Sequence, residues 1–226
     1  MMWTNKISDE VLDIITPYSD WFFSQDLTCL DEISKIKDKK TYDIHGACGE
    51  EYLKEIVDKD GEHEGYPEET YSIDIGMLHV LPYDNKYINE IIEHQEKRQE
   101  MSLKLTTILG ARNQAVNVYY PSGGFMGWHN NWNAAGYNIL LTYSQDGDGF
   151  FRYRDPKTHE IITMEDRVGW SCKVGYYGRG REPDKVYYHC AGSNSPRLTL
   201  GFIIPDLDMW RDMIEDITGE DASHFS

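Results

Sequence analysis

Two imidazoles and one amide stand where strand-like runs end, and they are the side chains in this chain best suited to hold a metal ion. His129 and Asn131 form a His-x-Asn pair, and His189 follows sixty residues later, after Val186-Tyr187-Tyr188. Side chains two positions apart on a strand project to the same side, so His129 and Asn131 can face one ion. The second histidine then has to come from a neighbouring strand. Two imidazoles and one oxygen donor occupy one face of an octahedral metal and leave three positions open. Non-haem Fe(II) is held in this way for oxygen chemistry.

A second pair of residues is suited to hold a carboxylate. Arg197 and Thr199 are two positions apart in an apolar run, so they share one strand face and offer a guanidinium and a hydroxyl to one anion. A guanidinium that points inward from a core strand requires a negative partner, because an isolated buried charge is costly. Tyr119 and Tyr120 are adjacent in an earlier run, so only one of them can face the same interior.

In their order along the chain, these residues resemble a known family. Tyr120-Pro121-Ser122-Gly123 runs into His129, and a distal histidine and an Arg-x-Thr pair follow. This constellation is similar to the Fe(II)/2-oxoglutarate-dependent oxygenases, particularly the prolyl 4-hydroxylase-like branch. The Arg-x-Thr pair resembles the Arg-x-Ser of the isopenicillin N synthase-like branch. The resemblance covers roughly residues 105–205.

The resemblance implies a set of roles. Fe(II) would be held by His129, Asn131 and His189. The cosubstrate 2-oxoglutarate would be bound by Tyr120, Arg197 and Thr199. With O₂, such a site hydroxylates a substrate, which here could be a peptidyl residue, an amino acid or a nucleotide-like small molecule. No catalytic residue beyond the metal ligands is assigned.

Asn131 departs from the family pattern, in which the oxygen ligand is an Asp. An amide oxygen is neutral, and losing a negative charge beside a divalent ion weakens its binding. Three interpretations stay open. Asn131 is a ligand in a working site, or another acid such as Asp146 or Asp148 is recruited. In the third, the protein is a catalytically degenerate jelly-roll binding protein with a weakened metal site.

Four further residues are candidates for substrate binding. Trp132 and Asn133 follow the His-x-Asn pair directly, and Arg152 lies on a strand whose face it shares with Arg154. Arg179 belongs to the basic loop Gly178-Arg179-Gly180-Arg181, which could hold an anionic group.

Charge and cysteine content narrow the partners. The chain has 226 residues and a net charge of −17, but residues 150–200 carry +3 and residues 1–149 carry −14. The acidic bulk argues against duplex nucleic acid as a partner, and the basic segment would attract a small anion. Four unpaired cysteines, no long apolar run and no secretory signal predict a cytoplasmic protein with no membrane span. The oligomeric state is not determined by the sequence.

The pattern of elements predicts a mainly β protein with flanking helices. Residues 7–40 read as helical with a break or kink at Pro17. Ser72 to Leu81 reads as a strand, and Asp84 as the N-cap of a helix to about Glu100, with Ile88, Ile91, Ile92 and Gln95 buried. The expected strands after it are Leu103 to Ile108, Ala115 to Tyr120, Gly136 to Ser144, Phe150 to Arg154, Ile161 to Met164, Gly169 to Tyr177, Lys185 to His189 and Leu198 to Ile204.

Short strands at regular spacing with Gly/Pro turns are typical of a sandwich or barrel. With the family resemblance, they imply a double-stranded β-helix, a jelly-roll or cupin-like fold. We expect one globular domain. It would consist of an N-terminal helical and mixed support region, 1–102, a catalytic core, 103–205, and a C-terminal helix, 206–226, capped by Asp206.

Overall fold

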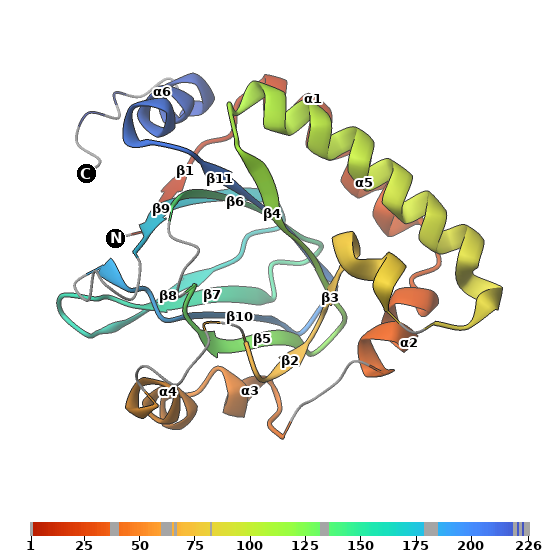
Figure 1. Cartoon of the computed structure of the whole chain (residues 1–226), viewed down its shortest axis with the longest axis horizontal. Helices are drawn as coiled ribbons and strands as arrows, with labels where there is room; N and C mark the ends of the chain where they lie inside the picture. Colours follow the sequence, from red (N-terminus) through yellow and green to blue (C-terminus); the bar gives the residue numbers. More distant parts are fainter. Residues whose placement is uncertain are drawn as a thin grey trace.

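Two antiparallel sheets face each other across the middle of the molecule (Figure 1). The structure is a computed structural model and describes residues 2–36, 41–59, 65, 67–81, 83–131, 136–178, 185–218, 221 and 223. In order across the sheet, the larger one contains β1 (Trp3–Asn5), β9 (Gly169–Tyr177), β6 (Gly136–Ser144), β11 (Arg197–Ile204), β4 (Asn113–Tyr120) and β3 (Ile73–Asp74). The smaller one contains β2 (Thr70–Tyr71), β5 (Gly124–His129), β10 (His189–Ser193), β7 (Gly149–Arg154) and β8 (Ile161–Glu165).

The eight strands from β4 to β11 have jelly-roll topology. In the larger sheet they lie in the order β9-β6-β11-β4, and in the smaller sheet in the order β5-β10-β7-β8. Along the chain β4 and β5 lie in opposite sheets, as do β6 and β7, β8 and β9, and β10 and β11. Within each sheet, neighbouring strands of this set pair antiparallel. The fold is therefore a double-stranded β-helix. The spacing of strands and turns predicted a sandwich or barrel, and the family resemblance implied this variant of it.

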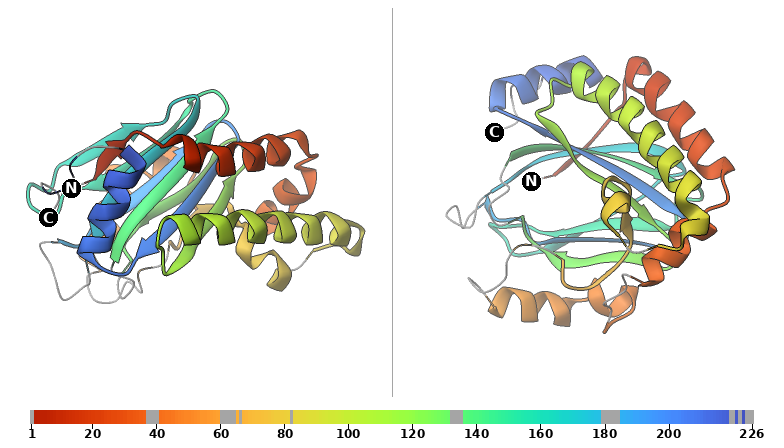
Figure 2. Two further views of the ribbon diagram at one scale, coloured as in Figure 1. Left: turned by 90° about the horizontal axis from the view of Figure 1, so that it is seen from above. Right: turned by 45° about the vertical axis from the view of Figure 1, so that its right-hand side comes forward.

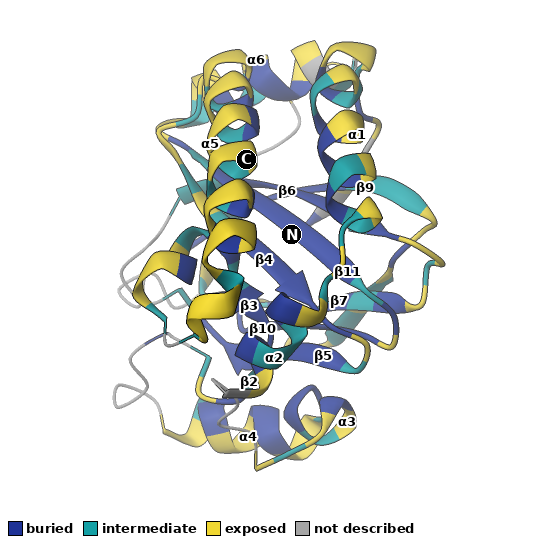
Figure 3. Cartoon of the chain, turned by 90° about the vertical axis from the view of Figure 1, so that its right-hand side faces the viewer, coloured by how far each residue is buried: buried dark blue, intermediate teal, exposed yellow. Residues whose placement is uncertain are grey.

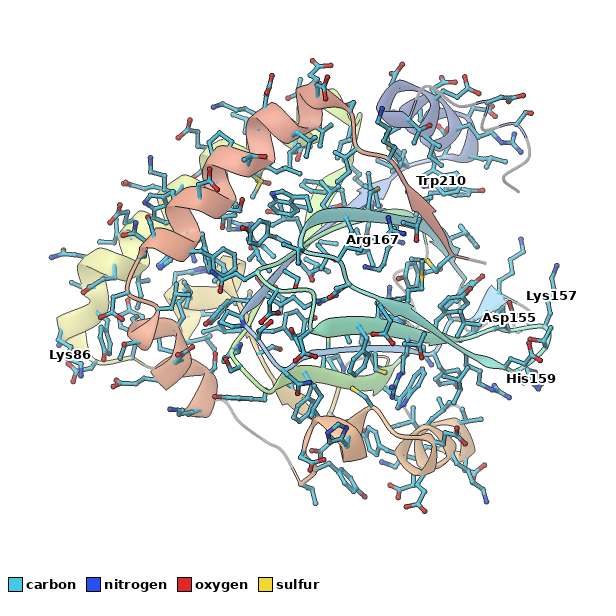
Figure 4. The ribbon with its side chains drawn as sticks, turned by 180° about the vertical axis from the view of Figure 1, so that it is seen from behind. Lys86, Asp155, Lys157, His159, Arg167 and Trp210 are labelled. Carbon is cyan, nitrogen blue, oxygen red and sulfur yellow. The ribbon has the colours of Figure 1, made fainter. Side chains whose placement is uncertain are left out.

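Helices cover the outer face of the larger sheet. α1 (Asp9–Ser24) and α5 (Ile88–Ile108) lie side by side on it, with α2 (Thr28–Ile36) at one end and α6 (Leu207–Thr218) at the other (Figure 2). Two 3₁₀ turns, η1 (Ile75–Val80) and η2 (Asn85–Tyr87), precede α5. Trp210 of α6 points toward the sheet (Figure 4), and its indole Nε1 donates to the Asn138 carbonyl at 3.4 Å. Figure 3 shows the buried inner and exposed outer faces of α1 and α5.

Two short helices cover the outer face of the smaller sheet. α3 (Ile44–Ala47) is capped by Asp43, whose carboxylate accepts from the Gly46 amide, and α4 (Glu50–Asp58) follows it. Their apolar residues pack on Phe125, Trp128 and Cys190 of the sheet. Among the described helices, none is long and apolar enough to cross a membrane.

Strand alternation separates the inner core from the outer ones. Tyr119 points outward, packs on Phe22 of α1 and donates its hydroxyl to Asp31 of α2 at 3.0 Å. Tyr120 points inward, into a cluster between the sheets with Phe151 and Tyr177. The expectation that only one of these two tyrosines faces the interior is confirmed.

Most of the expected strands are present, but the region before β4 differs. Gly136–Ser144 and Gly169–Tyr177 have the predicted bounds. Leu103 to Ile108 is the last part of α5 and not a strand: Met101 and Leu105 are buried four residues apart, and Leu103 is 70% exposed. Apolar residues that alternate over only six positions also fit one face of a helix, and here the helix packs on the sheet.

Three further expectations were wrong in detail. Pro17 does not break the helix but lies inside α1, because residues on both sides of it, such as Ile15 and Phe22, pack on the core and outweigh the local cost. Ser72 to Leu81 forms only the two-residue β3 and then a 3₁₀ turn. On α5, Ile88 and Ile92 are about half exposed, and the buried residues are Ile91, His94, Met101 and Leu105.

Around the second histidine the strand begins later than expected. β10 starts at His189, where the predicted strand ended, and runs to Ser193. Asp206 accepts from the Met209 amide at 2.9 Å and so caps α6, as predicted.

Candidate functional site

A cavity of about 80 Å³ lies between the two sheets. Its walls come from both sheets and are mostly apolar, with side chains such as Leu140 and Phe151. A single buried water needs about 10–15 Å³, so the space can take a small organic molecule. Six residues that the sequence singled out line it together: Tyr120, His129, Asn131, His189, Arg197 and Thr199.

The two histidines meet at one end of the cavity. His129 is the last residue of β5 and His189 the first of β10, and they are direct partners in the antiparallel register. Directly opposite residues on one face bring their side chains together, and here the ring centroids are 4.2 Å apart. Both residues are buried. The expectation that the second histidine lies on a strand beside the first is confirmed.

Hydrogen bonds orient both rings in the same way. Nδ1 of His129 lies 2.8 Å from the carbonyl oxygen of Gly127, and Nδ1 of His189 lies 3.0 Å from that of Tyr187. A carbonyl can only accept, so each Nδ1 carries a proton, and in the neutral form of the ring Nε2 then carries the lone pair. This is the tautomer that binds a metal through Nε2. Burial lowers the pKa of His189 to about 3, which keeps its ring neutral, as a metal ligand must be.

The third donor at this end is an amide. Asn131 lines the cavity two residues after His129. Within the described part of the chain, no three His, Cys, Asp or Glu side chains lie close enough to hold a metal together. Asp146 bonds to the Ser195 hydroxyl, and Asp148 to Asn194 at 3.1 Å. These contacts lie beyond Ser193, the far end of β10 from His189, so neither acid is recruited to the histidine pair.

Arg197 lies at the other end, fully buried on β11. Its Nε donates to Asp166 Oδ2 at 2.6 Å, and its Nη1 donates to the Thr199 hydroxyl at 2.8 Å. The guanidinium also lies 4.9 Å from the centre of the Tyr120 ring. Burial alone would lower the pKa of Arg197, but Asp166 and Tyr120 raise it above its ordinary value. The group therefore stays charged.

A second cation shares the same carboxylate. Lys173 Nζ lies 2.9 Å from Asp166 Oδ1, and the side chains of both are almost fully buried. Lys173 faces inward because β9 pairs it with Leu140, which lines the cavity. Burial would raise the pKa of Asp166, but Arg197 and Lys173 hold it below its ordinary value. Burial lowers the pKa of Lys173, and Arg197 adds to this, while Asp166 opposes it.

This cluster has two cationic groups and one carboxylate. A buried charge without a partner is costly, so the cluster favours a further anion on its cavity side. Burial also raises the pKa of Tyr120 to about 12, partly offset by Arg197, so its hydroxyl keeps its proton and can donate to such an anion.

Sequence reasoning missed Asp166 and Lys173. A lysine in the middle of a strong strand, at an inward position in the alternation of Gly169–Tyr177, is the one signal that could have found Lys173. Asp166 stands between β8 and β9, where an acid normally faces solvent. Its burial follows only from the fold, which brings it against Arg197, 31 residues away in the chain.

Arg152 does not reach the cavity, contrary to expectation. Phe151 lines the cavity, so the next side chain points to the other face of β7. There Arg152 donates to the Cys48 carbonyl at 3.1 Å and to the Thr163 hydroxyl at 3.2 Å, and it lies over the Phe150 ring. It holds α3 against the smaller sheet. Trp132, Asn133 and Arg179 lie outside the described residues.

No protein-family model and no curated protein matches the chain. Among solved structures, a prolyl-4-hydroxylase from Pseudomonas putida is similar at 14% identity and a TM-score of 0.30, over 66% of this chain and 82% of that one. OsALKBH1 is similar at 15% identity and a TM-score of 0.27, over 54% of this chain and 67% of that one.

A third similar structure is a rice dioxygenase for auxin oxidation. The identity is 12% and the TM-score 0.27, over 60% of this chain and 55% of that one. Similarities this distant say nothing about activity, so the chemistry has to follow from the cavity itself.

Proposed function

We propose that this protein is an Fe(II)- and 2-oxoglutarate-dependent dioxygenase that hydroxylates a small substrate or a peptidyl residue. One observation carries the proposal: a cavity between the sheets has a pair of buried histidines at one end and a buried cluster with an excess of positive charge at the other. A ligand with a metal-chelating end and a distal carboxylate matches both ends at once.

The residues at the histidine end fit a divalent metal with open coordination positions. His129, His189 and Asn131 would hold it, because two neutral imidazoles and an amide oxygen leave one face of the ion for ligands. Bound there, Fe(II) would supply the redox chemistry by which O₂ oxidises 2-oxoglutarate and a C–H bond of the substrate. Three neutral donors bind a divalent cation less tightly than a set that contains a carboxylate.

The residues at the arginine end would select and orient the cosubstrate. Asp166 accepts a hydrogen bond from Nε of Arg197, and Thr199 accepts one from its Nη1. These two bonds fix the plane of the guanidinium. A guanidinium has five N–H donors, so others can reach a ligand carboxylate. The Tyr120 hydroxyl can donate to the same anion. The mostly apolar cavity walls lower the local dielectric constant, which strengthens these contacts.

The neutral metal end also supports a second candidate, a jelly-roll protein that binds a dicarboxylate without redox chemistry. The observation that favours it is the absence of a third acidic or thiol ligand among the described residues near the histidine pair. Such a protein would keep the charged end of the cavity and bind metal weakly.

Calorimetry with Mn(II) and 2-oxoglutarate, followed by an assay for succinate, separates the two. For an oxygenase we expect both ligands to bind, Mn(II) to strengthen 2-oxoglutarate binding, and Fe(II)-dependent succinate release with a suitable substrate. His189→Ala should abolish the effect of Mn(II) and leave residual 2-oxoglutarate binding through Arg197.

A chain that binds neither Mn(II) nor 2-oxoglutarate excludes both candidates. A chain that binds 2-oxoglutarate, releases no succinate, and gains this activity on Asn131→Asp is the degenerate binding protein. If Asn131→Asp lowers an existing turnover, the amide is part of a working site.

A further inference from the structure

Asn138 is a polar residue of the cavity wall to which the proposed function gives no role. It lies on β6, is 5% exposed, and lines the cavity together with Leu140 and Thr142 of the same strand. Alternate residues of a strand share one face, so these three side chains form a row along the inner face of the larger sheet. Buried polar groups normally have hydrogen-bond partners, so the partners of this amide show what the cavity can bind.

One end of the Asn138 amide is occupied, and the other end is available to a ligand. Nδ2 donates to the Gly136 carbonyl oxygen at 2.8 Å, and because that oxygen can only accept, the contact fixes which end of the amide is nitrogen. Oδ1 has no hydrogen-bond partner within the described part of the chain. It is not among the partnerless atoms that have no accessible surface, such as the Tyr187 hydroxyl. Oδ1 is therefore an acceptor that a molecule in the cavity can reach.

The backbone that carries this amide is held from the other side of the sheet. There the Asn138 carbonyl accepts from the Trp210 indole Nε1 of α6 at 3.4 Å (Figure 4). The bond from Nδ2 to Gly136 holds the side chain as well. The acceptor is thus fixed in direction before a ligand arrives, which favours selective recognition.

The register of β6 places Asn138 at the histidine end of the cavity. Gly136, two residues before it, pairs with Tyr177 of β9, whose ring centre is 4.9 Å from that of His189. Arg197 pairs with the last residue of β6, six positions after Asn138 or roughly 20 Å along the strand. Asn138 is therefore placed to contact a substrate beside the metal and not the carboxylate at the arginine end.

The charges around the cavity favour an uncharged group at this place. Arg197 is the only arginine, lysine, aspartate or glutamate among the described residues that line the cavity, and the proposed function assigns it to 2-oxoglutarate. A phosphate or carboxylate of the substrate would meet no further cation there, and an ammonium group would meet no carboxylate. Burying a charge without a partner is costly. An uncharged N–H or O–H group can pair with Oδ1 while the apolar walls take the rest of the molecule.

We propose that Asn138 is a specificity-determining residue that selects substrates with an uncharged N–H or O–H donor, as in an amide or an alcohol. The inference rests on the proposed function, because it takes the molecule beside the histidine pair to be the substrate. A site that hydrogen-bonds a substrate group rejects the analogue without that group strongly, since its own polar atom is then left unpaired. A peptidyl residue offers such a donor, whereas a nucleotide-like molecule would have to keep its phosphate outside the cavity.

NMR titration of the full chain with matched small probes tests this. The Asn138 side-chain NH₂ signals, assigned by their absence from Asn138→Leu, report on the site. N-Methylacetamide carries an N–H, and methyl acetate has the same size with an oxygen in its place. We expect N-methylacetamide to shift these signals and to bind about fivefold more tightly than methyl acetate, the effect of one hydrogen bond. Equal binding, or tighter binding of the ester, overturns the proposal.

Charged probes test the choice of an uncharged donor. Methylammonium and methyl phosphate, added with 2-oxoglutarate present to occupy Arg197, should leave the Asn138 signals unshifted. Either of them binding at these signals more tightly than N-methylacetamide overturns the proposal.

A matched pair of variants assigns the preference to Asn138. Asn138→Leu keeps a side chain of similar size without the acceptor, and Thr142→Val makes a polar-to-apolar change farther along the same inner row. The methyl signals of the probes measure affinity in both variants. We expect the fivefold preference for the amide over the ester to disappear in Asn138→Leu and to persist in Thr142→Val. A preference that survives in Asn138→Leu, or is lost equally in both, overturns the proposal.

Mn(II) separates this inference from the proposed function. With Mn(II) and 2-oxoglutarate bound, the paramagnetic ion should broaden the methyl signals of bound N-methylacetamide, and His189→Ala should remove the broadening. A chain that binds both ligands but shows no preference for the amide overturns the role of Asn138 alone. A chain that keeps the preference but binds neither ligand overturns the proposed function and leaves the Asn138 contact in place.

An alcohol probe distinguishes the two sources of the donor. 2-Propanol replaces N-methylacetamide in the same titration. The probe that loses more affinity in Asn138→Leu shows whether the site takes an amide N–H or a hydroxyl. If neither probe loses affinity, Oδ1 does not bind the substrate and the proposal is wrong.

Discussion

The two ends of the cavity between the sheets differ in the charge of their side chains. At the end with His129 and His189, the donors are neutral, and the described residues nearby add no carboxylate. At the end with Arg197, two cationic side chains share Asp166, and all three are buried. At the histidine end, no carboxylate among the described residues would balance a metal cation. At the arginine end, one carboxylate balances only one of the two cationic side chains. A ligand that brings carboxylates would satisfy both.

The arginine end is more fully preorganised for a ligand than the histidine end. Around Arg197, every contact is made before a ligand arrives, by Asp166, Thr199 and the Tyr120 ring. Around the histidines, backbone carbonyls fix the ring orientation, but Asn131 gives little charge to hold a metal. We therefore expect the anion end to dominate stability and cosubstrate affinity, and the metal end to be the weaker site.

Asp166→Asn should have the largest effect, because it leaves two buried cations with no carboxylate. Breaking a buried ion pair costs on the order of 3–5 kcal/mol. Urea denaturation measures this loss in the free energy of unfolding, and Asp208→Asn, at a side chain that is 92% exposed, is the matched control with almost no expected loss. 2-Oxoglutarate should restore more stability to Asp166→Asn than to the wild type. A variant within about 1 kcal/mol of the wild type would show that Asp166 is not the partner that keeps these cations buried.

Acid should act in the same direction as this substitution. The folded-state pKa of Asp166 lies below its ordinary value, so its contribution to stability is present above the unfolded-state pKa. That contribution is lost as the pH falls through the folded-state value. The loss of stability on acidification should therefore be smaller in Asp166→Asn than in the wild type, and parallel curves would contradict this.

Arg197→Gln should weaken 2-oxoglutarate binding by more than any other single change in the cavity. Truncating one partner of a buried charged contact costs about 2–5 kcal/mol, which is roughly 30-fold or more in affinity. Isothermal titration calorimetry measures it. Arg152→Gln makes the same chemical change on the outer face of β7 and should leave the affinity unchanged. If the two variants behave alike, the anion does not bind at Arg197.

Asn131→Asp sharpens the comparison from the metal end. Adding a carboxylate beside the histidine pair should raise Mn(II) affinity by about tenfold or more, because the new negative charge lies next to the ion. Competition with a fluorescent chelator reports this. Asn113→Asp, an exposed position at the start of β4, controls for the change in net charge. An unchanged Mn(II) affinity would mean that residue 131 does not face the ion.

Thr199→Val should give the smallest effect of the series. It removes the hydroxyl that accepts from Arg197 Nη1 at 2.8 Å and keeps the side-chain volume. We expect about 1 kcal/mol, or roughly fivefold, in 2-oxoglutarate affinity. Thr142→Val, at the direct cross-strand neighbour on β6, tests the general polarity of the wall. Equal losses at both positions would point to polarity and not to the hydrogen bond with Arg197.

The sequence predicted the strands whose two faces both pack against other layers. β6 and β9 are nine residues long, and β6 has the apolar middle Ile139-Leu140-Leu141; the bounds of both were predicted correctly. It failed where one apolar pattern fits two periods, as at Leu103 to Ile108, and where the strand is very short, as at β3. It also did not predict the three-residue strand β1, which pairs with β9 at the edge of the larger sheet.

The order and types of a few residues by themselves determined the two chemical ends of the site: imidazoles and an amide at one, a guanidinium and a hydroxyl at the other. Period-two spacing also required that only one tyrosine of the 119–120 pair point inward. Only the tertiary structure decided that Asp166 and Lys173 complete the arginine end and that Arg152 faces away from the cavity. Spacing along one strand encodes which face a side chain takes, but the pairing of distant strands decides which charges meet.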